Sequence, residues 1–218
     1  MRAWPVTLRE DPGPPARFSS LLLRPLRRNE QADWDRVRGV NTAWLAPWEP
    51  SDPALERPDK IEPWTRPSFG SYVRSLNRQA RSGHSVPWVI EVDGELAGQV
   101  TAGSMVYASQ RSAVVGYWVS HHLAGRGIAP LALAMMIDYL LAERALHRVE
   151  ICIRPENEAS IRVVQKLGLR YEGVRPRFIH INGQWSDHLV YALDTSEWNG
   201  PGTLVARWYE WLRTGSDS

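Results

Sequence analysis

Cysteine is almost absent from this chain of 218 residues. Cys152 stands alone, so no internal disulfide can form. We interpret it as a small core residue, with a nucleophilic thiol as the less favoured alternative. Residues 1–20 also lack the apolar core of a secretory signal. These absences predict a protein of a reducing compartment, by default the cytoplasm, whose fold needs no disulfide.

Long apolar runs, metal-binding patterns and an excess of one charge are missing as well. No apolar stretch approaches the roughly 18 residues of a membrane span, so no membrane partner is expected. No HExxH or CxxC spacing occurs, so no metal site is expected. The 26 basic and 24 acidic residues give a net charge of +2, which is too balanced to indicate direct readout of a nucleic acid.

The chain has instead the composition of a globular domain, 43% apolar and 23% charged, with alternating helical and strand patterns. Hydrophobic periodicity predicts helices over residues 29–44, 68–81, 128–144, 157–167 and 198–213. Predicted strands cover residues 21–26, 88–92, 96–107, 113–119, 148–153, 171–181 and 184–193. This order predicts one α/β unit over residues 21–198, preceded by an extended segment at 1–20 and followed by a helix and tail at 199–218. A Pro-rich stretch, residues 47–67, is long for a loop and indicates a functional surface.

Two glycines stand between a predicted strand and a predicted helix. Gly125 and Gly127 permit close backbone approach there, and the first backbone amides of the helix have no helical acceptor. Together with the helix dipole these amides predict a pyrophosphate site, to which Arg126 adds charge. A plain strand-to-helix turn is the alternative. The spacing matches neither GxxxxGK[ST] nor GxGxxG, which excludes a P-loop and a dinucleotide fingerprint.

The run His122-x-x-Gly125-x-Gly127 resembles the Q/R-x-x-G-x-G/A motif of the GCN5-related N-acetyltransferases (GNAT). Residues 44–50 (WLAPWEP) and 182–188 (NGQWSDH) are similar to the RimJ-type ribosomal-protein-alanine N-acetyltransferases. The resemblance spans about residues 21–198 and implies the GNAT fold, a mixed and mostly antiparallel sheet of about seven strands flanked by helices. His122 departs from the family's Gln or Arg, which removes any side-chain role that depends on that residue type.

The resemblance also implies acetyl-CoA as the cofactor. Trp118 and Val119 match the family's strand that pairs with the pantetheine arm. Asn157 and Ser160 match family residues that contact this arm. Asn157 has a simpler reading as the N-cap of the following helix. The resemblance places the CoA diphosphate on the backbone amides of Leu123, Ala124, Gly125, Arg126, Gly127, Ile128 and Ala129.

Acetyl transfer to an amine needs a neutral attacking nitrogen, donors for the oxyanion and a proton for the departing thiolate. Many family members supply that proton from a tyrosine, but the matching position here is Val164. Ser160 is the best remaining donor, with Tyr117 or a water molecule as fallback, and a backbone N–H of the Val119 strand is expected to meet the oxyanion.

The acceptor side is predicted to contain Trp48, Glu49 and Trp185. Glu49 is the first candidate for the base, because partial desolvation between Trp48 and Pro50 would strengthen it, although an exposed surface carboxylate is an equally good reading. Asp187 and His188 are the second candidates. Adjacent strand residues point to opposite faces, so only one of these two can line the groove.

The resemblance to the RimJ type implies transfer of acetyl from acetyl-CoA to a protein N-terminal α-amine, with ribosomal protein as the partner, by direct attack in a ternary complex. An α-amine, with a pKa near 8, is neutral far more often at pH 7 than a lysine, near 10.4. Acetylation of a small-molecule amine is the rival within the same chemistry. A non-catalytic acyl-CoA-binding or ribosome-assembly module is the rival from another class. Either a monomer or a homodimer is compatible with the sequence.

Overall fold

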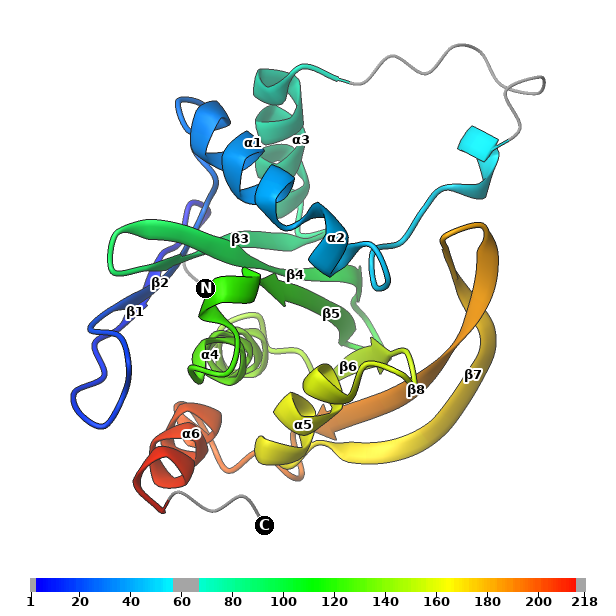
Figure 1. The fold of residues 1–218 in the computed structure, drawn as a ribbon. Helices are drawn as coiled ribbons and strands as arrows, with labels where there is room; N and C mark the ends of the chain where they lie inside the picture. Colours follow the sequence, from blue (N-terminus) through cyan, green and yellow to red (C-terminus); the bar gives the residue numbers. More distant parts are fainter. Residues whose placement is uncertain (1–2, 57–66, 215–218) are drawn as a thin grey trace.

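One mixed sheet organises the computed structural model, which describes residues 3–56 and 67–214 (Figure 1). Its strand order is β1-β2-β3-β4-β5-β6-β8-β7, and every neighbouring pair is antiparallel except β5 and β6. The predicted mixed, mostly antiparallel sheet is therefore confirmed, with eight strands where about seven were expected. The strands are β1 Leu8–Glu10, β2 Leu21–Arg24, β3 Val86–Val92, β4 Glu95–Val106, β5 Ser112–Val119, β6 Arg148–Ile153, β7 Arg170–Ile181 and β8 Gln184–Asp194.

The extra strand, β1, comes from the segment at residues 1–20. It pairs with β2, and the segment buries Val6 and Phe18 in the main core. The indole of Trp88 donates a hydrogen bond of 2.9 Å to the carbonyl oxygen of Val6. The N-terminal segment is thus held to the same core as the rest of the sheet.

Helices cover both faces of the sheet (Figure 1). Helices α1, α2 and α3 lie on one face, where Trp34, Val37 and Val73 pack on Val89. On the other face lie α4, α5 and α6, and α4 is buried around nearly its whole girth, as its apolar sequence predicts. The bounds are α1 Gln31–Val40, α2 Thr42–Leu45, α3 Phe69–Arg81, α4 Ile128–Ala142, α5 Glu158–Lys166 and α6 Thr203–Thr214, with 3₁₀ turns η1 Pro53–Glu56 and η3 His121–Leu123.

The predicted helix at residues 29–44 is interrupted at Asn41. This side chain is buried, its amide donates to the Val37 carbonyl at 2.8 Å and to the Ser120 hydroxyl at 3.1 Å, and its Oδ1 accepts from the His121 amide at 2.8 Å. A polar residue that bonds backbone groups in this way competes with the helical pattern. The break between α1 and α2 is therefore fixed to the start of η3.

Strands β5 and β6 run side by side only briefly. Their parallel register covers Ser112–Val114 against Arg148–Glu150 and then stops. Residues 115–119 of β5 remain paired with β4 on the other side but have no strand partner towards β6 among the described residues. The sheet therefore opens at its centre. No helix in residues 3–56 and 67–214 is long and apolar enough to cross a membrane.

Candidate active site

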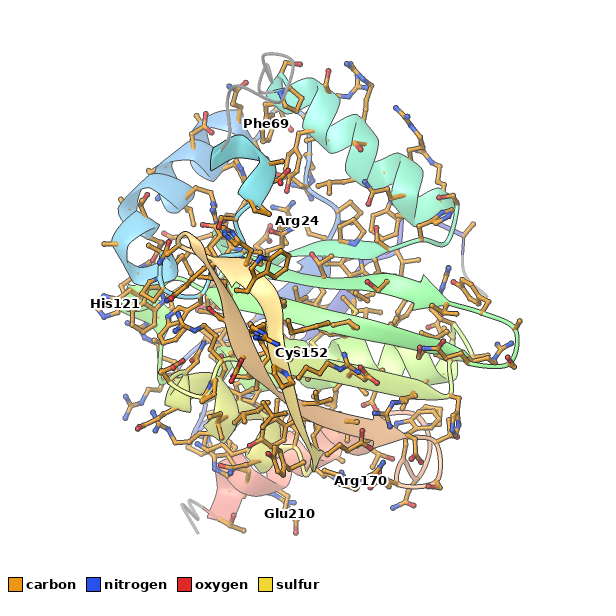
Figure 2. All side chains as sticks on the ribbon, turned by 90° about the vertical axis from the view of Figure 1, so that its right-hand side faces the viewer. Arg24, Phe69, His121, Cys152, Arg170 and Glu210 are labelled. Atoms are coloured by element: carbon orange, nitrogen blue, oxygen red, sulfur yellow. The ribbon has the colours of Figure 1, made fainter. Side chains whose placement is uncertain are left out.

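A cavity of about 850 Å³ lies where β5 and β6 diverge. It is lined from both strands, from α1 and α3, from residues 45–50 and from the hairpin β7–β8. Figure 2 looks onto this side, with the hairpin in front of the sheet, Cys152 near the centre and Phe69 above. The volume is at the upper end for ligand pockets. Of the residues predicted for the site, the lining includes Trp48, Glu49, Tyr117, Trp118, Asn157, Ser160 and His188.

The predicted proton donors, Ser160 and Tyr117, lie next to each other. The Tyr117 hydroxyl donates a long hydrogen bond of 3.4 Å to the carbonyl oxygen of Ser160. Burial raises the pKa of Tyr117, so its phenol stays protonated across the ordinary pH range. Ser160 lies in the first turn of α5, where its backbone N–H donates to the Oδ1 of Asn157 at 3.1 Å. Asn157 is therefore an N-cap and a cavity residue at once, while Val164 is fully buried in the core.

Glu49 lies at the cavity with 47% of its side chain exposed. Its carboxylate forms an ion pair with Arg38, whose guanidinium lies 5.3 Å from the centroid of the Trp118 ring. Glu49 is thus neither desolvated nor unpaired.

His188 is the more enclosed candidate base, with 3% of its surface exposed. Its Nδ1 lies 2.9 Å from the Ser186 carbonyl, which can only accept, so Nδ1 carries the proton and Nε2 has the lone pair. Burial lowers the pKa of His188, aided by the positive charge of Arg154, whereas the Ser186 bond and the nearby Glu156 and Asp187 act in the opposite direction. The imidazole is neutral at pH 7, the form that accepts a proton.

The other predicted acceptor-side residues of β8 lie outside the cavity. Asp187 is exposed, and its Oδ1 accepts a hydrogen bond of 2.7 Å from the Arg177 amide. Trp185 is 55% exposed and packs edge-on to His180, with ring centroids 5.5 Å apart. The alternation of the strand therefore directs His188, and not Asp187, into the cavity.

Residues 46–51 cross the acceptor side of the cavity as a strap. The Ser51 amide donates to the His180 carbonyl at 2.9 Å, and Asn182 donates to the Ala46 carbonyl at 2.9 Å. From the end of β6, Arg154 donates to the Pro47 carbonyl at 2.9 Å. These bonds tie the strap to the tip of the hairpin β7–β8. Part of the Pro-rich stretch predicted as a functional surface, residues 57–66, lies outside the described residues.

The glycine loop follows β5 directly and leads into α4. Gly125 and Gly127 have positive φ angles of 76° and 84°, and Gly127 is the N-cap of α4 without any capping side chain. The amides of Leu123 and Ala124 are used within the turn, donating to the carbonyls of Ser120 and His121. The amides from Gly125 to Ala129 have no acceptor in the part of the chain that the structure describes. Such a cluster at a helix N-terminus is suited to an anion.

Three residues of this site are missing from the sequence prediction. Arg38 lies over the Trp118 ring and Arg154 donates to the Pro47 carbonyl, and such contacts between residues far apart in the chain leave no local pattern. Gly98 lies in β4, and a Cβ there would stand 2.2 Å from the backbone oxygen of Trp118. Gly98 could have been found from the sequence, because an isolated glycine within a strand pattern indicates that another backbone approaches closely.

No metal site is found in the described residues, and Cys152, which was expected to be a core residue, is half-buried and lines the cavity. No group of three or more His, Cys, Asp or Glu side chains comes together there in a metal-binding arrangement. Burial raises the pKa of the Cys152 thiol, and the Arg175 guanidinium lies 3.6 Å from its sulfur. A protonated thiol is a poor nucleophile.

Comparison with known families agrees with this geometry. The model of the acetyltransferase (GNAT) domain matches residues 20–170, which is more than half of the chain. The chain belongs to the GNAT acetyltransferase family. The match ends at the first residue of β7, so β8 and α6 lie beyond the matched region.

Solved and curated relatives place the chain further within the family. Mycobacterium smegmatis RimJ in complex with CoA-disulfide has a TM-score of 0.78 and 34% identity, covering 97% of this chain and 96% of that one. Probable N-acetyltransferase YjcK of Bacillus subtilis is 35% identical over 46% of this chain and 56% of its own length. The ribosomal protein uS5-alanine N-acetyltransferase of Escherichia coli is 31% identical over 50% of this chain and 55% of its own. The chain thus spans about half the length of these curated relatives.

The residues present fit a CoA thioester. The amides from Gly125 to Ala129 match a diphosphate, and the backbone of residues 115–119, which has no strand partner on the side towards β6, matches an extended amide-containing arm. The Val119 carbonyl there already accepts a hydrogen bond of 3.2 Å from the Trp44 indole. The cavity continues from Tyr117 and Trp118 towards His188, which leaves room for an acyl group and an acceptor.

Proposed function

We propose that this protein transfers an acetyl group from acetyl-CoA to the N-terminal α-amine of a protein. The proposal is carried by one strand: the side of β5 towards β6 has no strand partner at residues 115–119, the same strand lines the cavity that contains His188 and Ser160, and it leads directly into the loop whose amides at the start of α4 have no acceptor among the described residues. The similarity to RimJ over nearly the whole chain, together with the partial match to the ribosomal protein uS5-alanine N-acetyltransferase, supports an α-amine of a ribosomal protein as the acceptor.

Acetyl-CoA would supply the acetyl group as an activated thioester. Nε2 of His188 accepts a proton from the acceptor amine, and its neutral state suits an amine whose pKa is near 8. The Ser160 hydroxyl donates a proton to the departing thiolate, with the Tyr117 phenol beside it. Backbone N–H groups of β5 near Val119 stabilise the oxyanion.

Acetylation of a small amine is the second candidate. The strap at residues 46–51 crosses the acceptor side, and aromatic side chains line the cavity, namely Trp34, Trp48, Phe69, Tyr72 and Trp118. Such a pocket suits a compact cation as well as a chain terminus.

Thiol release from acetyl-CoA tests these alternatives. The acceptors are a peptide with a free N-terminal alanine, the same peptide with a blocked N-terminus, and spermidine. We expect release with the free peptide and none with the blocked one. Release with spermidine alone would replace the proposal with a small-molecule enzyme. Binding of CoA with no release from any acceptor would replace it with a binding module.

A further inference from the structure

Helix α6, which lies outside the matched GNAT domain, contacts the glycine loop directly. The indole Nε1 of Trp208 donates a hydrogen bond of 2.8 Å to the carbonyl oxygen of Gly127, and Trp208 is 1% exposed. A Cβ on Gly127 would lie 3.4 Å from that nitrogen and 3.5 Å from the ring of Trp211. Trp208 and Trp211 of α6 thus pack directly against Gly127, the N-cap of α4.

The same helix also holds the far end of α5. Arg207 donates to the carbonyl of Leu167, the C-cap of α5, at 3.0 Å. Because α5 carries Asn157 and Ser160 at its other end, α6 is bonded to both helices that border the predicted CoA site. Figure 1 shows α6 beside α4 and close to the end of α5.

The position of α6 is itself fixed from within the core. Asp138 of α4, which is buried, accepts hydrogen bonds from the Trp198 indole at 2.7 Å and from the Leu204 and Val205 amides at 3.3 and 3.2 Å. The Asp138 carboxylate therefore caps the start of α6, and negative charge at a helix N-terminus is favourable. Asp138 of α4 thus holds the start of α6, and Trp208 further along α6 bonds the loop that leads into α4.

We propose that Trp208 is a positioning residue for the CoA diphosphate, acting through the Gly127 carbonyl. The Leu131 amide of α4 also donates to that carbonyl, at 3.3 Å, and Trp208 adds the shorter bond from outside the helix. Together these bonds set the peptide plane between Gly127 and Ile128, and with it the direction of the Ile128 amide. The amides from Gly125 to Ala129 converge on an anion only while this part of the loop keeps its geometry. This inference rests on the proposed function in one respect, namely that the loop binds the diphosphate.

The test compares Trp208→Phe with Tyr209→Phe. Tyr209 is the next residue of α6 and donates to Glu10 at 2.9 Å, away from the loop, so its variant is a matched loss of one hydrogen bond. We expect Trp208→Phe to raise the Kd for CoA, measured by calorimetry, about threefold to tenfold, the effect of one hydrogen bond. Tyr209→Phe should change it less than twofold.

A second readout separates positioning from general loosening. Acetyl-pantetheine lacks the diphosphate, so its kcat/KM should be equal in the wild type and Trp208→Phe, while that for acetyl-CoA falls. If Trp208→Phe cannot be purified, Trp208→Met removes the same N–H donor and should show the same selectivity for acetyl-CoA. An unchanged Kd, or equal losses with both donors, overturns the inference. Absence of CoA binding in the wild type would instead overturn the proposed function.

Discussion

The hydroxyl of Tyr117 lies 3.4 Å from the backbone carbonyl of Ser160, so the two candidate proton donors of the cavity are in contact. The Tyr117 hydroxyl donates its proton to that carbonyl, and its raised pKa means that the phenol stays protonated. Ser160 is consequently the group with a hydroxyl proton to give, and Tyr117 is the group that helps to place it.

This relationship predicts different results for two substitutions. Ser160→Ala should lower kcat about tenfold to a hundredfold, because it removes a general acid, while the backbone bond from residue 160 to Asn157 remains. Tyr117→Phe should lower kcat less than tenfold. Steady-state kinetics and calorimetry with CoA provide the measurement, and the Kd for CoA should stay within twofold in both. A larger loss in Tyr117→Phe than in Ser160→Ala would reverse the two roles.

The pH dependence should identify His188 as the base. Its pKa is lowered below the ordinary value of about 6.5, so the neutral form persists at pH 6.5 and the acid limb of kcat/KM should fall below that pH. His188→Gln should remove this limb and reduce kcat about a hundredfold. Glu49→Gln is the control, since Glu49 is half exposed and paired with Arg38. A severe loss in Glu49→Gln with a normal His188→Gln would return the role to Glu49.

Glycine substitutions should separate backbone strain from ligand binding. Gly125 and Gly94 have φ angles of 76° and 87°, and a Cβ added at either position would meet no atom within 4 Å beyond its chain neighbours. Alanine at either site should therefore lower the free energy of unfolding by about 1 kcal/mol, from strain alone. Only Gly125→Ala should also weaken CoA binding, because Gly94 lies in the β3–β4 turn. Equal Kd values for the two variants would argue against an anion site at the loop.

The ion pairs of Glu172, in β7, should make the free energy of unfolding depend on pH in acid. Arg148 and Arg170 both bond Glu172, and they hold the pKa of its carboxyl at about 2. A lowered pKa means that the carboxylate stabilises the fold above its unfolded pKa, near 4.3, and that this contribution is lost as the pH falls towards 2. Glu172→Gln should thus cost about 1 kcal/mol at pH 6 and almost nothing near pH 2.

Urea unfolding at several pH values measures this difference. Glu158→Gln is the matched control, because the Glu158 side chain is 81% exposed and its contact with Arg162 is long, at 3.5 Å. It should leave the free energy of unfolding unchanged. A cost of Glu172→Gln that does not vary with pH would contradict the electrostatic explanation.

The sequence is a good guide wherever structure is decided by neighbouring residues. The hairpin turns at Asp93-Gly94 and Asn182-Gly183 occur as predicted, with positive φ at all four residues. The long helix after Gly127 follows equally from local apolar pattern and from the glycine before it. The core of the sheet and the place of the glycine loop could therefore be predicted.

Features set by distant contacts could not be predicted. Strand β1 has only three residues and depends on pairing with β2. The break at Asn41 depends on Ser120 and His121, which lie far along the chain. The ion pair between Glu49 and Arg38 forms only when α1 and the strap are brought together. The sequence alone therefore does not show that the Glu49 carboxylate is paired.

The early end of the pairing between β5 and β6 has a consequence for the stability of the whole sheet. Strands β1–β5 and β6–β8 are joined to each other by three residues of each strand at the divergence, together with the helices that span them. A ligand that lies along residues 115–119 would complete the hydrogen bonding there, so the amide hydrogens facing the gap should exchange with deuterium more slowly as CoA is added. The two halves should then unfold more cooperatively, and the melting temperature should rise with ligand concentration.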